Sequence, residues 1–141
     1  MLLKIHPQAE FLSVIATGQF SVDEMKRAFL EMLEAVAVHK TTKVLFDGRG
    51  LLGHVGTMDR FYYAEFVARS VADFHERGVS PGTQFAYLLK EPVLDPERFG
   101  ETVAVNRGAN VKAFASHEAA LRWLGVEPTS APEGGGGESR A

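Results

Sequence analysis

Three glycines in the sequence have the spacing of a dinucleotide-binding loop. Gly48, Gly50 and Gly53 follow an apolar run. In such a loop a helix begins inside the motif, directs backbone N–H groups at a pyrophosphate, and is followed about twenty residues later by an acid at the end of the next strand. Here a helix is expected only from Thr57, and Asp73 falls inside it. We therefore expect no nucleotide to bind at this motif.

The residue types that most often support catalysis do not occur at the spacings of known catalytic or metal-binding motifs. The five histidines lack the spacing of a zinc site, there is no cysteine, and neither HExxH nor GxSxG occurs. Asp47 closes a predicted strand, where α/β proteins place ligands, but its carboxylate is equally suited to accept hydrogen bonds from the following backbone. Arg49 beside it is suited to a surface ion pair. We expect no catalytic residues, no metal and no cofactor, with an enzyme centred on Asp47 as the weaker alternative.

Composition indicates a single globular domain. The chain has 141 residues, of which 45% are hydrophobic and 23% charged, and a net charge of −3. No basic run of the nucleic-acid-binding type occurs, and charges interrupt every apolar stretch before membrane length. We therefore expect no nucleic-acid partner, no integral membrane segment and a cytoplasmic location, which the absence of cysteine fits.

Hydrophobic periodicity and capping signals predict alternating strands and helices. Strands are expected over residues 2–6, 10–20, 43–47, 83–89 and 111–115. Four helices are expected to begin at capping residues: Ser21, which forms a capping box with Glu24, then Thr57, Asp95 and Ser116. Glycines at 78, 108 and 125 are expected to end the last three. The order ββαβαβαβα predicts an α/β fold with a mixed five-stranded sheet covered by helices. The domain is assigned to residues 1–126, followed by a flexible Gly/Pro/Ser-rich tail over residues 127–141.

The second predicted helix carries more apolar surface than one sheet contact requires. One stripe contains Tyr63, Val67, Val71 and Phe74, and a second stripe points away from it. Three explanations stay open for the second stripe: cover by a neighbouring helix, a protein-binding patch, or a pocket for a nonpolar ligand. For the pocket, the candidate lining residues come from the second stripe, the preceding glycine-rich loop and the third helix: Met58, Phe61, Tyr62, Phe66, Leu51, Leu52, Phe99 and Val103.

The end of the chain carries a resemblance to a known family. Residues 99–124, FGETVAVNRGANVKAFASHEAALRWL, are similar to the end of a STAS-like family related to bacterial anti-sigma-factor antagonists and to CRAL-TRIO lipid-carrier domains. The most specific matches are Asn106-Arg107-Gly108 and the stretch from Ala119 to Leu124. The resemblance implies a STAS-like fold, and it implies a structural, core position for Trp123.

The same resemblance implies a binding protein rather than an enzyme. Its leading implication is a noncatalytic carrier or sensor of small nonpolar, lipid-like molecules. The alternative is a STAS-type regulatory module that binds another protein, with a homodimer also left open. Phospho-switched STAS domains carry an Asp-Ser pair where this chain has Gly56-Thr57. Thr57 is thus the candidate phosphoacceptor, but the departure from the pair predicts that phosphorylation is not the main switch.

Overall fold

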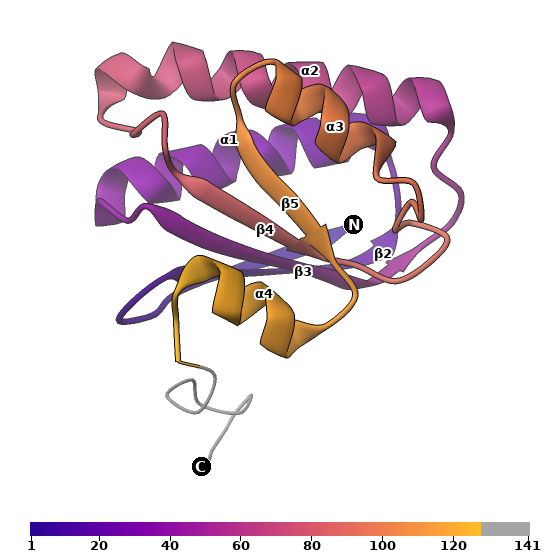
Figure 1. Cartoon of the computed structure of the whole chain (residues 1–141), viewed down its shortest axis with the longest axis horizontal. Helices are drawn as coiled ribbons and strands as arrows, with labels where there is room; N and C mark the ends of the chain where they lie inside the picture. The colour runs from indigo at the N-terminus through magenta and orange to yellow at the C-terminus, as the bar shows by residue number, and fades with distance from the viewer. Residues whose placement is uncertain (128–141) are drawn as a thin grey trace.

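A five-stranded mixed sheet forms the centre of the protein in the computed structural model, which describes residues 1–127 (Figure 1). The strands lie side by side in chain order. The first two form an antiparallel hairpin, and the remaining neighbours are parallel. The strands are β1 (Leu2–Pro7), β2 (Leu12–Gln19), β3 (Lys43–Leu52), β4 (Gln84–Leu88) and β5 (Asn110–Phe114). This arrangement confirms the predicted ββαβαβαβα order.

Helices cover the two faces of the sheet unequally. Figure 1 shows α1, α2 and α3 together on one face and α4 on the other. The helices are α1 (Val22–His39), α2 (Thr57–Asp73) with the 3-10 turn η1 (Phe74–Arg77), α3 (Phe99–Asn106) and α4 (His117–Leu124). The larger hydrophobic cluster lies under α1, α2 and α3, whereas a smaller one lies under α4.

Local signals account for the ends of several helices. The Ser21 hydroxyl accepts a hydrogen bond from the backbone N–H of Glu24 at 3.4 Å, as the predicted capping box requires. The Ser116 hydroxyl likewise accepts one from Ala119 at 3.2 Å. Gly125 follows α4 in the left-handed conformation that favours glycine. The predicted starts of α1 and α4 are therefore confirmed.

Trp123 is only partly buried. It packs on the smaller cluster, and its ring centroid lies 5.8 Å from that of Phe114. The fully buried positions of α4 are Ala120, Leu121 and Leu124. The expected core position of Trp123 is thus at the edge of the core rather than inside it.

The prediction that the third strand ends at Asp47 is wrong. β3 continues to Leu52 because β2 continues beside it after a register shift between Ile15 and Thr17, pairing Thr17 with Gly50. A Cβ atom on Gly50 would lie 2.8 Å from the Thr17 Cγ2 atom. Close packing within the sheet therefore accounts for this glycine, which does not lie in a strand-to-helix turn.

The predicted start of the third helix is also wrong. α3 begins at Phe99, four residues after Asp95. The Asp95 carboxylate accepts hydrogen bonds from the N–H groups of Glu97 at 3.1 Å and Phe99 at 2.8 Å, which makes a turn before the helix. The prediction that Asp95 caps this helix is therefore wrong: the cap residue is Arg98, which offers no side-chain hydrogen bond, and the chain turns once after Asp95 before it becomes helical.

Except for Glu127, the predicted tail over residues 127–141 lies outside the described residues. Across residues 1–127, no helix is both long enough and apolar enough to span a bilayer.

Candidate functional site

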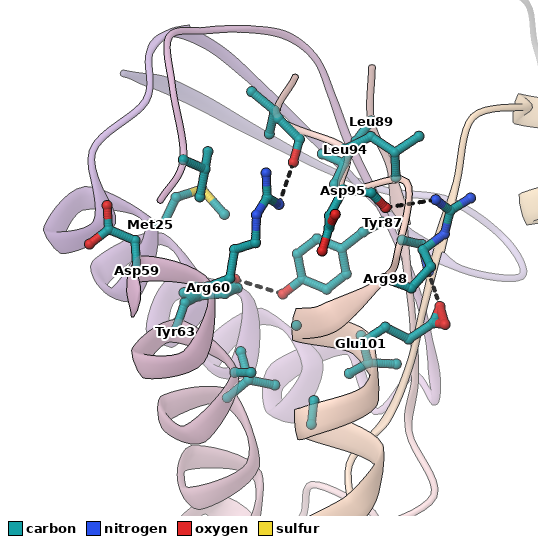
Figure 2. Close-up of a pocket in the computed structure, with 18 of the residues that line it drawn as sticks. Met25, Asp59, Arg60, Tyr63, Tyr87, Leu89, Leu94, Asp95, Arg98 and Glu101 are labelled. Carbon is teal, nitrogen blue, oxygen red and sulfur yellow. Dashed lines mark hydrogen bonds between the residues drawn. The ribbon is translucent and has the colours of Figure 1, made fainter. Parts of the chain in front are cut away.

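A cavity of about 110 Å³ lies between α2, α3 and the loop over residues 89–98 (Figure 2). Its floor comes from the sheet, at Leu51 in β3, Tyr87 in β4 and Ala113 in β5. Most of the lining is aliphatic or aromatic. The carboxyl ends of parallel strands are where α/β folds place ligands, so the position and the lining both fit a binding site.

Two tyrosines meet inside this cavity. The hydroxyl oxygens of Tyr63, from α2, and Tyr87, from β4, lie 2.6 Å apart and form a hydrogen bond. Figure 2 shows the two side chains directed toward each other. The Tyr63 ring packs edge-on against Phe29, and the Tyr87 ring is tilted against Phe46 with centroids 5.1 Å apart. These contacts hold both hydroxyls in place.

Both tyrosine hydroxyls stay protonated at neutral pH. Burial raises the pKa of Tyr63 well above its usual range, and the neighbouring Tyr87 adds to that rise. Burial also raises the pKa of Tyr87, and the hydrogen bond with Tyr63 offsets only part of this effect. The pair therefore carries two protons and no charge.

Arg60 fastens the loop over residues 89–98 to α2. Its guanidinium donates to the carbonyl oxygens of Val93 at 2.7 Å and Pro92 at 2.9 Å. Val93 and Leu94 of this loop are buried and line the cavity. The loop thus closes one side of the cavity through a fork of two charge-assisted hydrogen bonds.

Charged groups near the cavity are engaged in structural contacts. The Arg98 guanidinium donates to the carbonyl of Asp95 at 2.9 Å, and Arg98 itself adopts a left-handed φ of 56°. The hydrogen bond from the Phe99 N–H is the largest influence that holds the pKa of the Asp95 carboxyl below its usual range. The Glu101 carboxylate accepts from the Ala113 N–H at 2.8 Å, which ties α3 to β5. The cavity walls are therefore tied together on several sides.

The structure brings one of the eight predicted ligand-binding residues to this cavity. Leu51 lines it, whereas the other seven are not among its described lining residues. Val103 is buried in the larger core cluster, and Leu52 and Phe99 are exposed. The predicted pocket residues on α2 lie on the side of the helix that does not line the cavity: Met58, Phe61, Tyr62 and Phe66.

These four residues form what we call the outer face of α2. Met58 is 55% exposed and Tyr62 is 50% exposed. Phe61 and Phe66 are partly buried on its two flanks, where Arg107 lies 5.3 Å from the Phe61 ring centroid and Lys26 lies 5.6 Å from that of Phe66. Neighbouring helices therefore cover the edges of this stripe and leave its centre at the surface.

Thr57 lies beside this face as the first residue of α2, and it is exposed. The expectation that Thr57 caps the helix is wrong, because the cap residue is Gly56, which offers no side-chain hydrogen bond. Its role as a phosphoacceptor stays a prediction.

Asp47 and Arg49 form a local ion pair. The Asp47 carboxylate accepts from the backbone N–H of Arg49 at 3.1 Å and from its guanidinium at 3.0 and 2.8 Å. Burial acts to raise the pKa of Asp47, but the hydrogen bonds from Arg49 outweigh it and hold the pKa below its ordinary value. Both predicted structural roles are therefore confirmed: the Asp47 carboxylate accepts a hydrogen bond from the following backbone, and Arg49 forms an ion pair. No cluster of metal-ligating side chains occurs within residues 1–127.

The sequence reasoning missed the tyrosine pair, Arg60 and the loop that closes the cavity. Tyr63 was assigned to the first apolar stripe of the second predicted helix, and Tyr87 to the strand predicted over residues 83–89. A buried tyrosine hydroxyl usually has a hydrogen-bonding partner, so two inward tyrosines were the available signal. Their pairing depends on the placement of α2 over β4, which no local pattern specifies.

Comparison with solved structures supports the fold assignment. The protein is similar to the crystal structure of an anti-sigma factor antagonist from Mycobacterium paratuberculosis, with a TM-score of 0.51 and 12% sequence identity. The match covers 87% of this chain and 92% of that chain. No family model matches the sequence, and no curated protein matches it. The likeness concerns the fold, and it confirms the predicted STAS-like α/β architecture.

Proposed function

We propose that the protein is a noncatalytic regulatory module that binds a protein partner through the outer face of α2. The observation that carries this proposal is that Met58 and Tyr62, at the centre of the apolar outer face of α2, are exposed. Methionine and tyrosine are enriched in protein interfaces, and exposed apolar groups are typical of interaction sites.

The fold likeness adds weight to a regulatory partner. The similar structure is that of an anti-sigma factor antagonist, a protein whose name denotes action on an anti-sigma factor. We therefore favour a partner that itself regulates transcription. Its contact surface is expected to be apolar at the centre, to match Met58 and Tyr62, and polar around them, to match Glu65 and Arg107, which form an ion pair of 3.3 Å at the edge of the face.

Carriage of a lipid receives less support from the geometry. The cavity of about 110 Å³ compares with about 150 Å³ for an engineered protein cavity that accepts one benzene molecule. A lipid chain does not fit in a space of that size. The outer face of α2 does not line the cavity, so its apolar residues are better explained by a protein contact.

The proposal is tested by recovering partners from cells of the source organism with tagged wild-type protein and with the Met58→Ser/Tyr62→Ser variant. A transcription regulator recovered with the wild type and lost with this variant would support the proposal. The matched control is Val38→Ser, because Val38 is an apolar residue on α1 that is 72% exposed and is not part of the outer face of α2. Equal recovery with both variants, or self-association as the only interaction lost, would overturn the proposed partner.

A further inference from the structure

The tyrosine pair leaves one hydrogen-bond donor unused inside the cavity. Two neutral hydroxyls carry two protons, and the 2.6 Å bond between Tyr63 and Tyr87 uses one of them. Whichever oxygen accepts that bond still has its own O–H group. No second hydrogen bond to either hydroxyl is found within residues 1–127. Both tyrosines line the cavity, Tyr87 being 6% exposed and Tyr63 partly buried, so the remaining O–H group lies where a ligand would lie whichever ring carries it.

A buried donor without an acceptor is costly, which makes the pair a recognition element. A ligand that brings an oxygen acceptor recovers the missing hydrogen bond, whereas a hydrocarbon of the same shape does not. The surrounding side chains restrict the rest of the ligand to apolar groups, since Leu51, Ala64, Val67 and Leu94 line the same space.

Charge around the cavity argues against an ionic ligand. The lining contains three carboxylates, from Asp59, Asp95 and Glu101, and two guanidinium groups, from Arg60 and Arg98. Both arginines already donate to backbone carbonyls, so neither is available as a dedicated anion site. An anion would meet a net negative surrounding. Two of the three carboxylates that could pair with a cation already accept backbone N–H groups, Asp95 from Glu97 and Phe99 and Glu101 from Ala113.

We propose that this cavity binds a small uncharged apolar molecule, about one ring in size, through a hydrogen bond from the Tyr63–Tyr87 pair to a single ketone-type or aldehyde-type oxygen of the ligand. The cavity volume of about 110 Å³ is of the same order as the volume of about 150 Å³ that accepts benzene, so one small ring is the upper limit on ligand size. The oxygen follows from the unused donor. Figure 2 shows how Tyr63, Tyr87 and the loop residue Leu94 surround this space. The site is separate from the outer face of α2, so this inference does not depend on the proposed partner.

The test compares cyclohexanone with methylenecyclohexane, which has the same shape but carries =CH₂ in place of the oxygen. Binding is followed by NMR titration of the side-chain methyl groups of Leu51, Val67 and Leu94. We expect saturable shifts with cyclohexanone at millimolar concentration. One net hydrogen bond should make its binding about three- to tenfold tighter than that of methylenecyclohexane.

Two variants locate the interaction. In Tyr63→Phe/Tyr87→Phe both hydroxyls are removed and the ring shapes are kept, so the two probes should bind equally. Ala64→Leu fills the cavity and should reduce cyclohexanone binding at least tenfold, whereas Ala72→Leu, the same change at an exposed position of α2, should not. The inference is overturned if cyclohexanone gives no saturable shifts, if its preference survives the double variant, or if Ala64→Leu binds like wild type.

Discussion

The hydroxyl oxygens of Tyr63 and Tyr87 lie 2.6 Å apart inside the protein, each tyrosine supplying the hydrogen-bonding partner of the other. This mutual dependence predicts strongly non-additive mutations. Tyr87→Phe alone leaves the Tyr63 hydroxyl buried without its partner and should lower the free energy of unfolding by about 1–3 kcal/mol. Tyr63→Phe/Tyr87→Phe removes both polar groups and should lie within about 1 kcal/mol of wild type. Urea denaturation of wild type, Tyr63→Phe, Tyr87→Phe and the double variant completes the cycle, and additive costs of the two single variants would contradict the pairing.

The same pair predicts a loss of stability at alkaline pH. Burial raises the pKa of both tyrosines in the folded state, whereas in the unfolded chain their pKa is about 10. Above that pH the unfolded state has lost protons that the native state keeps, so the free energy of unfolding falls as pH rises. The slope approaches about 1.4 kcal/mol per pH unit for each tyrosine. Their contribution is fully present below pH ~10.

The tyrosine double variant is the control for this alkaline effect. Lysines also titrate in the same range, so the informative quantity is the difference between wild type and Tyr63→Phe/Tyr87→Phe as a function of pH. We expect this difference to be constant up to about pH 10 and then to move steadily in favour of the variant. If the free energies of unfolding of the two proteins instead stay parallel through about pH 11, the hydroxyls lose their protons in the folded protein as readily as in the unfolded chain.

Gly48 is predicted to be required for packing in the sheet. A Cβ atom there would lie 2.8 Å from Leu89 Cδ2 and from Cε2 of the fully buried Phe46 ring. Gly48→Ala should therefore cost about 1–3 kcal/mol through overpacking, measured by thermal or urea denaturation. Gly82→Ala is the control, because its nearest neighbour would be the Ser80 hydroxyl at 3.8 Å. Equal stability of the two variants would show that the surroundings of Gly48 yield easily.

Local sequence signals predicted the element order, the sheet class and two of the four helix N-caps because these depend on periodicity and on side-chain-to-backbone bonds within a few residues. The Ser21 and Ser116 caps are examples. The end of β3 was mispredicted because Gly48 and Gly50 look like loop residues, and only their packing against Leu89 and Thr17 explains them inside a strand.

The candidate site was less predictable than the fold for the same physical reason. The apolar stripes of α2 were visible in the sequence, but which stripe lines a cavity depends on how the helix lies over the sheet. Tyr63 belongs to the stripe expected to be core, and it reaches Tyr87 from a separate strand. Arg60 binds carbonyls more than thirty residues later in the chain, and no spacing rule relates such positions.

Arg60 is predicted to keep the loop over residues 89–98 closed. Arg60→Ala removes the hydrogen bonds to Pro92 and Val93 and should increase amide exchange across this loop by about tenfold, as expected for the loss of about 1.4 kcal/mol. Arg60→Lys should recover only part of the protection, since an ammonium group lacks the planar fork. Arg69→Ala, at an exposed position of the same helix, is the control. Unchanged exchange in Arg60→Ala would show that apolar burial of Leu94 suffices.

The two sides of α2 are predicted to respond oppositely to polar substitution. Val67 is 2% exposed and faces the cavity and core, so Val67→Ser should lower the free energy of unfolding by several kcal/mol through lost apolar burial and a buried hydroxyl. Tyr62→Ser, on the outer face, should change it by about 0.5 kcal/mol or less because half of the side chain is already in water. Urea denaturation at equal protein concentration gives both values.

The comparison also separates an interface from ordinary surface. If the outer face binds a partner, Tyr62→Ser should weaken that association while leaving unfolding almost unchanged, and Val67→Ser should reduce both through the loss of folded protein. Aromatic residues at the centre of an interface commonly cost more than 1–2 kcal/mol when truncated, which corresponds to a roughly tenfold or larger loss of affinity. If Tyr62→Ser instead unfolds as readily as Val67→Ser, the outer face packs as core, and the proposed interface on it is contradicted.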